Sequence, residues 1–248
     1  MSGHSKWATI KHKKAAVDKV RGKTFAKLSR LLEVAAREGG GDPATNASLR
    51  TVVAKAKAAS MTNDAIDRAI KRGTGETDGE AYEAVTYEAY GPGGVAMLIE
   101  ILTDNRNRTA ADVRMIFSKQ GGSMAAPGSV AWQFSRKGVL LVPKSTSEDV
   151  LMTVGLEHGL EDVSPDDEMW HMTADPSQVF DLKAALESAG VDVISASTTM
   201  LSSNSVVVTD AAEARAILRI MGELDDNDDV QDVFANFDIA ESLMQEVG

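Results

Sequence analysis

Apolar residues recur every three or four positions near the start of the chain. Within residues 15–37 they stand at Val17, Phe25, Leu28, Leu31, Leu32 and Ala35. This spacing predicts an amphipathic helix, and the three glycines at 39–41 predict its end. Gly22 interrupts the stretch, so the residues before it are open to a second interpretation as a separate turn or arm.

Two more helices are predicted before residue 75. Asp42 followed by Pro43 fits the N-cap and first position of a helix, whose apolar face is formed by the residues at 49, 52, 53 and 56. A third helix is predicted over 63–72, with Ile66 and Ile70 facing inward and Gly73 at its end. These elements form a predicted three-helix domain.

After Gly75 the pattern changes to short, strand-like apolar runs. Two of them, residues 82–90 and 95–103, flank the turn GPGG and predict a hairpin. A helix near 109–120 and strands over SVAWQF and from Gly138 follow. The next elements are a helix over 148–157, a hairpin around 164–167, a helix over 177–188 and a strand over 191–199. From the strand at Gly138 onward this is the β-α-β-β-α-β order of a ferredoxin-like unit.

The tail predicts a strand in SVVVT, a helix over 211–224 and a last strand in VQDVFANF. Because SVVVT needs strands beside it, we expect the tail to complete the sheet begun at Tyr82. The sequence thus predicts an α+β protein, with an N-terminal three-helix domain followed by two α/β (ferredoxin-like) domains, one inserted in the other. The predicted boundaries are 1–75 for the helical domain, 76–134 with 205–248 for the α/β domain, and 135–204 for the insert.

Charge is divided unevenly between these parts. Residues 1–75 hold 16 of the 26 Lys and Arg but only 6 of the 37 Asp and Glu, a net charge of +10. The whole chain has a formal charge of −11, so the remainder has −21. An asymmetry of this size indicates separate domains with separate partners.

The basic N-terminal segment is the first candidate site. Dense positive charge with Asp18 as the one acidic residue among the first thirty favours a polyanion such as nucleic acid, although a run of charges is also typical of a solvated helix face. Trp7 would either stack on a base or anchor the segment to the helices. The candidate residues are Lys6, Trp7, Lys11, Lys13, Lys14, Lys19, Arg21, Lys23, Lys27 and Arg30.

The second candidate is the segment DNRNRT, residues 104–109. Thr109 and Asp112 have the spacing of a capping box, which would place Arg106 and Arg108 beside a helix N-terminus. Backbone N–H groups and two guanidinium groups would then bind phosphate. The alternative is a polar loop in which Asp104 pairs with one arginine.

Other chemistry is poorly supported. The chain has no Cys, which excludes disulfides and thiol catalysis and fits a reducing compartment. The four His lack metal-ligand spacing, and there is no Walker A sequence and no G-x-S-x-G motif. DDNDD at 225–229 lacks the residues of a calcium loop and is interpreted as a solvated acidic turn. We therefore expect no enzyme and no cofactor, with a metal-dependent phosphodiesterase as the remote alternative.

Several blocks of the sequence resemble the YebC/PmpR family. They are GHSKWATIKHKKA near the start, KAKAASM, AIKRGTGE, YGPGGVA, LTDNRNRTAADVR, GSVAWQF and DDVQDVFANF, and they span nearly the whole chain. The resemblance implies a helical domain followed by two α/β domains, one inserted in the other. It also implies a probable transcriptional regulator that binds DNA. The alternative is a factor that binds ribosomal RNA and relieves stalling at proline runs; a mitochondrial relative is a translational activator.

The expected partners are DNA, ribosomal RNA or both, together with the ribosome or a protein that contacts the acidic α/β domains. No small-molecule substrate is expected. No apolar run approaches the roughly 20 residues of a membrane-spanning helix, so no membrane partner is expected either. Because the family motif begins at Gly3, without room for a transit peptide, we expect a bacterial cytoplasmic protein.

Overall fold

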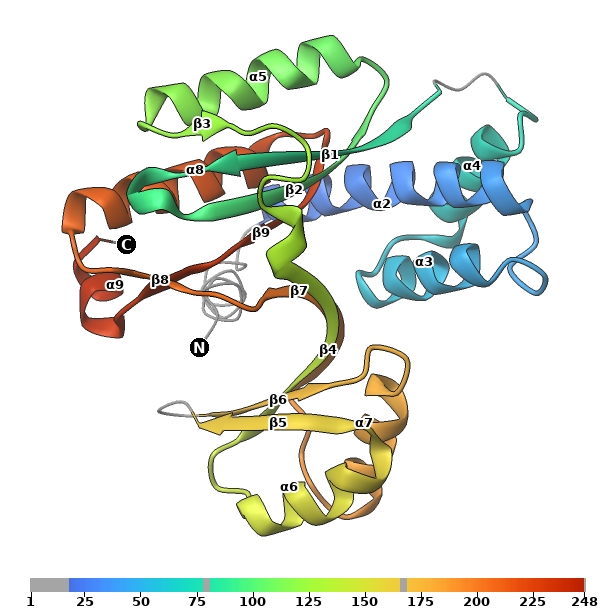
Figure 1. Ribbon diagram of the computed structural model, residues 1–248. Helices are drawn as coiled ribbons and strands as arrows, with labels where there is room; N and C mark the ends of the chain where they lie inside the picture. The colour runs from blue at the N-terminus through green and yellow to red at the C-terminus, as the bar shows by residue number, and fades with distance from the viewer. Residues whose placement is uncertain (1–17, 78–80, 166–168, 248) are drawn as a thin grey trace. The chain divides into compact units, whose positions relative to one another are not determined.

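The computed structural model describes residues 18–77, 81–165 and 169–247 (Figure 1). The chain forms two compact units. One runs from Trp132 to Ser205, and the other combines the described residues before this stretch with those after it.

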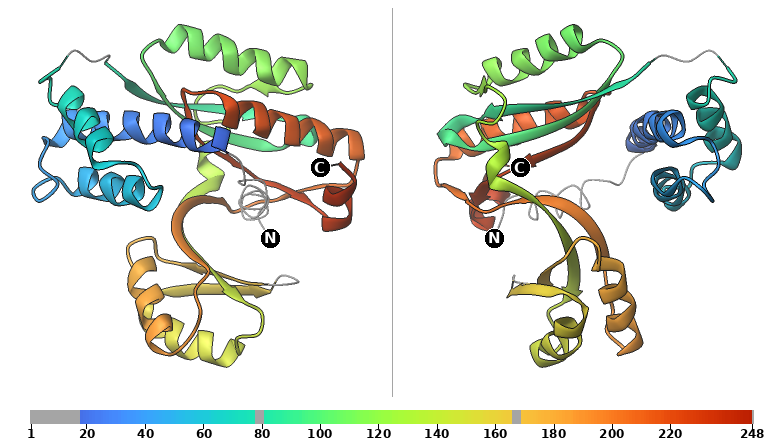
Figure 2. Two further views of the ribbon diagram at one scale, coloured as in Figure 1. Left: turned by 180° about the vertical axis from the view of Figure 1, so that it is seen from behind. Right: turned by 45° about the vertical axis from the view of Figure 1, so that its right-hand side comes forward.

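The described part of the N-terminal domain, which Figure 2 shows in blue to teal, consists of three helices: α2 (Asp18–Gly39), α3 (Ala47–Ala58) and α4 (Asn63–Gly73). Helix α2 runs through Gly22 without a break, so the described part of that stretch forms no separate turn. The apolar faces meet in a small core that includes Leu32, Leu49 and Ile66.

The start of α3 differs from the prediction. Its N-cap is Asn46, whose side chain accepts a hydrogen bond from Leu49 N at 3.0 Å, while the Asp42 carboxylate accepts from Ala44 N within a turn. The buried Asn46 amide also donates to Ala35 O at 2.7 Å. Asn46 is the N-cap in place of Asp42 because its side chain caps α3 and also donates a hydrogen bond to a backbone carbonyl of α2.

The second part of this unit contains a four-stranded antiparallel sheet in the order β3-β1-β2-β9. Its strands are β1 (Glu83–Tyr90), β2 (Ala96–Thr103), β3 (Ser123–Met124) and β9 (Val230–Ala235). The predicted GPGG turn joins β1 to β2 and contains a 3₁₀ turn, η1 (Pro92–Gly94). Gly93 and Gly94 both have positive φ there, which a residue with a Cβ rarely adopts.

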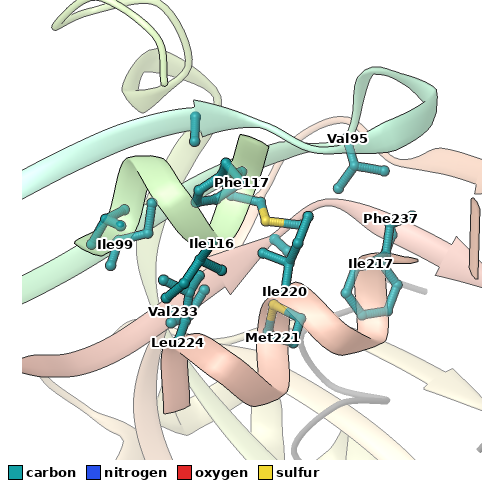
Figure 3. Packing of buried hydrophobic residues seen from close by; sticks show 14 of the residues in the cluster. Val95, Ile99, Ile116, Phe117, Ile217, Ile220, Met221, Leu224, Val233 and Phe237 are labelled. Atoms are coloured by element: carbon teal, nitrogen blue, oxygen red, sulfur yellow. The ribbon is translucent and has the colours of Figure 1, made fainter. Parts of the chain in front are cut away.

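Two helices, α5 (Arg106–Lys119) and α8 (Ala211–Asp226), form one hydrophobic core with this sheet. Figure 3 shows Ile116 and Phe117 of α5 pointing toward Ile220 and Leu224 of α8. All four side chains are buried, as is Ile99 of β2. Helix α8 therefore packs the C-terminal part of the chain against strands that lie about 120 residues earlier in the sequence.

The tail completes the sheet through β9 rather than through SVVVT. Strand β8 (Val206–Val208) pairs in parallel with β10 (Phe237–Ile239) in a separate two-stranded sheet, and a last helix, α9 (Glu241–Val247), follows. The sequence pattern missed β3, β10 and α9, which are too short to show a period of their own.

The unit from Trp132 to Ser205 is a ferredoxin-like β-α-β-β-α-β fold whose antiparallel strands stand in the order β5-β6-β4-β7. Two helices and these strands enclose a core around Leu140, Leu151 and Leu182. The elements are β4 (Phe134–Pro143), α6 (Glu148–Gly155), η3 (Leu156–His158), β5 (Leu160–Pro165), β6 (Met169–Ala174), α7 (Val179–Ser188) and β7 (Ser195–Ser202).

The strand predicted over SVAWQF is wrong. Residues 131–133 form a 3₁₀ turn, η2 (Ala131–Gln133), and only Phe134 belongs to β4. The reason is Glu88, a buried carboxylate that accepts hydrogen bonds from Gly128 N, Val130 N and Ala131 N and so bends the segment around itself. The predicted fold class is otherwise confirmed, and the domain boundaries stay a prediction.

Candidate nucleic-acid interface

The predicted binding residues fall into three groups. Lys6, Trp7, Lys11, Lys13 and Lys14 lie outside the described residues. Lys19 and Arg21 lie in α2, but their side chains are also outside what the structure describes. The structure places the other five, and three of these lie on α2 and two in the first turn of α5: Lys23, Lys27, Arg30, Arg106 and Arg108.

The three α2 cations all contact the acidic loop, which we define as residues 225–229 at the end of α8. Lys23 Nζ pairs with the Asp226 carboxylate, and Lys27 Nζ lies 3.5 Å from Asp225 Oδ1. Lys27 also donates to the backbone carbonyl of Asp225 at 3.1 Å. Two basic residues one turn apart on α2 thus meet two consecutive acidic residues.

Arg30, one turn further along α2, reaches the buried end of the acidic loop. Its Nη1 lies 3.2 Å from Asp229 Oδ1, and it also donates to the backbone carbonyl of Asp228. The guanidinium carbon lies 5.3 Å from the centroid of the Tyr82 ring, which is the geometry of a cation–π contact. The acidic residues of DDNDD therefore do not face solvent alone, as a solvated turn would require. Cations 198–203 positions away in the sequence neutralise the loop, so that interpretation is wrong.

Asp229 is the centre of this network. Only 4% of its surface is exposed, so its charge needs partners. Arg108 Nη2 donates to Oδ2 at 2.8 Å, and the Thr109 hydroxyl donates to the same oxygen at 2.6 Å. The Thr103 hydroxyl lies 3.2 Å from it. One carboxylate thereby joins β2, the start of α5, and α2.

The electrostatics of the pair follow from these contacts. Burial alone would raise the pKa of Asp229, but the hydrogen bonds from Thr109 and Arg108 and the charges of Arg108 and Arg30 outweigh it, so the pKa lies below its ordinary value of 3.8. Hydrogen bonds to Asp229 and then to Asp104 raise the pKa of Arg108 further above its ordinary value. Both groups are therefore charged at neutral pH.

The start of α5 corrects the prediction for DNRNRT. The helix begins at Arg106, not at Thr109, and its N-cap is Asn105, whose side chain accepts from Arg108 N at 3.1 Å. Thr109 is fully buried and its hydroxyl is directed to Asp229, so it cannot act as a cap. The sequence pattern offered Thr109 as a cap because burial of a threonine is not visible in local spacing.

Arg106 and Arg108 differ in their surroundings. Arg108 pairs with Asp104 at 2.7 Å as well as with Asp229, as the polar-loop alternative requires. Arg106 is exposed, and its backbone carbonyl accepts a hydrogen bond from the Tyr87 hydroxyl at 3.2 Å. Among the described residues, the Arg106 guanidinium has no ion-pair partner, so it is the cation of this segment that is available to an external anion.

The residues that the structure describes contain no group of three or more His, Asp or Glu placed to hold a metal ion. Within the same ranges, none of the helices is both long and apolar enough to span a membrane.

These features define a class of protein: a mixed α/β protein with a basic three-helix domain whose longest helix is ion-paired to an acidic loop. The chain belongs to the TACO1/YebC family. The model of the TACO1/YebC N-terminal domain matches residues 5–76, and that of the TACO1/YebC second and third domain matches residues 82–237. The predicted family resemblance is thereby confirmed.

Relatives match over nearly their full length. A protein of Rubrobacter xylanophilus is 54% identical, with 100% of this chain and 99% of the relative covered, and one of Halothermothrix orenii is 50% identical with the same coverage. Each is named a probable transcriptional regulatory protein, which supports a regulatory role for the family. The crystal structure of a conserved hypothetical protein from Aquifex aeolicus is similar with a TM-score of 0.80 and 45% identity, covering 95% of this chain and 97% of that one.

Proposed function

We propose that this protein is a nucleic-acid-binding regulator, without enzymatic activity, that acts in the cytoplasm as a DNA-binding regulator of transcription. The observation that carries the proposal is the concentration of positive charge on the three-helix domain, where residues 1–75 hold 16 of the 26 Lys and Arg. Charge of this density favours a polyanion partner. The names of the relatives support the regulatory part of the proposal.

The α2 contacts refine how such binding would work. A phosphate backbone accepts the same hydrogen bonds from lysine and arginine as a row of carboxylates does. Nucleic acid would therefore compete with the acidic loop for Lys23, Lys27 and Arg30. On this proposal the acidic loop discriminates against weak polyanions, since only a ligand with many simultaneous phosphate contacts repays the loss of the ion pairs.

A second candidate function is that of a ribosome-associated translation factor that relieves stalling at proline runs. The exposed Arg106 at the N-terminus of α5 favours it, because a guanidinium beside a helix N-terminus suits a phosphate group. Contacts to phosphate have little sequence information, so they serve ribosomal RNA as well as DNA.

Crosslinking in cells, followed by sequencing of the bound DNA and RNA together, tests the proposal. Promoter DNA in excess supports the transcriptional function, and ribosomal RNA in excess supports the second candidate. A triple variant, Lys11→Glu with Lys13→Glu and Lys14→Glu, should reduce recovery of the bound nucleic acid, whether DNA or RNA. The slope of log binding constant against log salt concentration should become shallower by up to about 0.9 per lost contact on duplex DNA. Recovery of neither nucleic acid above background would reject both functions.

A companion experiment addresses Arg106. On the second candidate function, Arg106→Ala removes rescue of stalled ribosomes, while Lys119→Ala, which removes an exposed cation from the other end of α5, does not. Full rescue by Arg106→Ala would reject a role for this residue in translation.

A further inference from the structure

A groove on the three-helix domain is lined by neither the α2 cations nor the acidic loop. It has a volume of about 490 Å³, which is within the range of roughly 300–1,000 Å³ typical of small-ligand sites. Helices α3 and α4 and the segment between α2 and α3 form its walls. The lining includes Pro43, Val53, Ile66, Ile70, Lys57 and Lys71.

The floor of the groove is apolar. Ile66 is buried, while Val53 and Ile70 are half-buried at the edge of the domain core and present apolar surface to the groove. A flat, apolar ligand face would bury this surface, and the face of a nucleobase is such a surface.

The rim of the groove has two lysines, one from the last turn of each helix. Among the described residues, the side-chain ammonium groups of Lys57 and Lys71 have no ion-pair or hydrogen-bond partner, and both residues are exposed. This distinguishes them from Lys23, Lys27 and Arg30, whose charges are already neutralised by the acidic loop.

Two acidic residues also line the groove. Glu76 accepts a hydrogen bond from the Thr74 hydroxyl at 3.1 Å. Asp67 is exposed and, with Asn63, offers hydrogen-bonding groups to the edge of a base. A ligand that combines an apolar face, polar edges and an anionic group matches this lining. A long row of phosphates matches it poorly, because Asp67 and Glu76 would repel it.

We propose that this groove binds one unpaired nucleotide of a single-stranded nucleic acid. The base lies on Val53, Ile66 and Ile70, and Lys57 and Lys71 bind the adjoining phosphates. The inference rests on the proposed function, and deepens it by naming the form of nucleic acid that the helical domain selects. Single-stranded DNA and a looped segment of RNA share this chemistry.

The chain offers a matched control for Lys57. Lys55 is exposed on the same helix, and its ammonium group has no partner among the described residues. A separation of two positions turns it about 200° around the helix, and it does not line the groove. Lys57→Glu and Lys55→Glu thus change the charge of the domain equally, and only the first changes the groove.

Binding of the full chain to fluorescent 20-nucleotide single strands of DNA and of RNA, and to the duplex of the same sequence, tests the inference. We expect Lys57→Glu to weaken single-strand binding roughly tenfold and Lys55→Glu to leave it within about twofold. Lys57→Glu with Lys71→Glu should lower the salt slope by roughly 1.4, from two lost contacts at about 0.7 each on a single strand. The affinities for the DNA strand and for the RNA strand, measured at one salt concentration, show which of the two nucleic acids the groove binds.

A second variant tests the contact with the base independently of the contacts between the lysines and the phosphates. Val53→Phe fills the floor of the groove without a change of charge and should weaken single-strand binding while duplex binding stays unchanged; its thermal unfolding is measured alongside. Equal losses for Lys55→Glu and Lys57→Glu, or tighter binding of the duplex than of either strand, would overturn the inference while the proposed function stands. Absence of binding to all three ligands by the unaltered chain would overturn both.

Discussion

Arg108 donates to the Asp229 carboxylate at 2.8 Å although 121 positions separate the two residues in the sequence. The other oxygen of that carboxylate lies 3.2 Å from Arg30 of α2. A single buried acid therefore holds together the helical domain, the start of α5 and the end of α8. The same residue that stabilises the fold also keeps the basic face of α2 against the acidic loop.

Replacing Asp229 with Asn should lower the free energy of unfolding by roughly 2–4 kcal/mol, because two arginines would lose the charge that neutralises them. Urea denaturation followed by circular dichroism measures the change. Asp104→Asn is the control, because it removes the more exposed partner of Arg108 and should cost at most about 1 kcal/mol. Equal losses for the two variants would contradict the central role of Asp229.

The stabilisation by Asp229 should depend on pH. Because its pKa in the folded protein lies below the ordinary value of 3.8, the stabilisation is complete above the unfolded pKa and is lost as pH falls through the folded pKa. The difference in unfolding free energy between the unaltered chain and Asp229→Asn should therefore stay constant above about pH 5 and shrink below about pH 4. Denaturation at a series of pH values checks this. A difference that does not shrink in acid would show that Asp229 acts through its shape and not through its charge.

Neutralising the acidic loop should make α2 more available to nucleic acid. Asp225→Asn with Asp226→Asn removes the carboxylates that pair with Lys27 and Lys23, so affinity for the polyanion should rise several-fold at low salt. Binding titrations measure the affinity. Asp149→Asn with Asp192→Asn is the control, since it removes the same charge from exposed positions of the ferredoxin-like unit. An equal rise for both pairs would mean that net charge, and not the loop contact, governs binding.

Two glycines in the helical domain should respond to Ala in opposite directions. A Cβ at Gly73 would overlap the backbone carbonyl of Glu33 and lie 2.8 Å from Ala36 Cβ, so Gly73→Ala should force α4 away from α2 at a cost of roughly 1–3 kcal/mol. Gly22 lies inside α2 with nothing within 4 Å of such an atom, so Gly22→Ala should stabilise by up to about 1 kcal/mol. Thermal unfolding of both variants measures the difference. A destabilised Gly22→Ala would contradict the open surroundings of that position.

The elements that the sequence predicted well are those whose signals are local. The helix predicted over 63–72 was found at Asn63–Gly73, and the hairpin was found on either side of GPGG. The errors lie where a distant contact overrides a local signal. SVAWQF alternates like a strand, yet the carboxylate of Glu88 binds the backbone around it.

The candidate site shows the same limit. A basic run and an acidic run both stand out in the sequence, and each was interpreted separately. That Lys23 meets Asp226 depends on tertiary structure across 203 positions, and local spacing does not encode it. The clue that was available was complementarity, because a helix rich in cations and a loop rich in acids in one chain are natural partners. Lys57 and Lys71, the lysines of the proposed groove, are not among the binding residues predicted from the sequence, because neither belongs to a long run of charges.

The order of strands in the central sheet has a consequence for synthesis of the chain. Strand β2 can find its partner β9 only after residue 235 has been made, whereas the ferredoxin-like unit is complete in one continuous stretch by residue 205. The inserted unit is thus able to fold while the ribosome is still translating, before the unit whose sequence flanks it on both sides. During that interval one edge of β2, with Met97 and Ile99, has no strand beside it, so a nascent chain halted before α8 would be the species most exposed to misfolding.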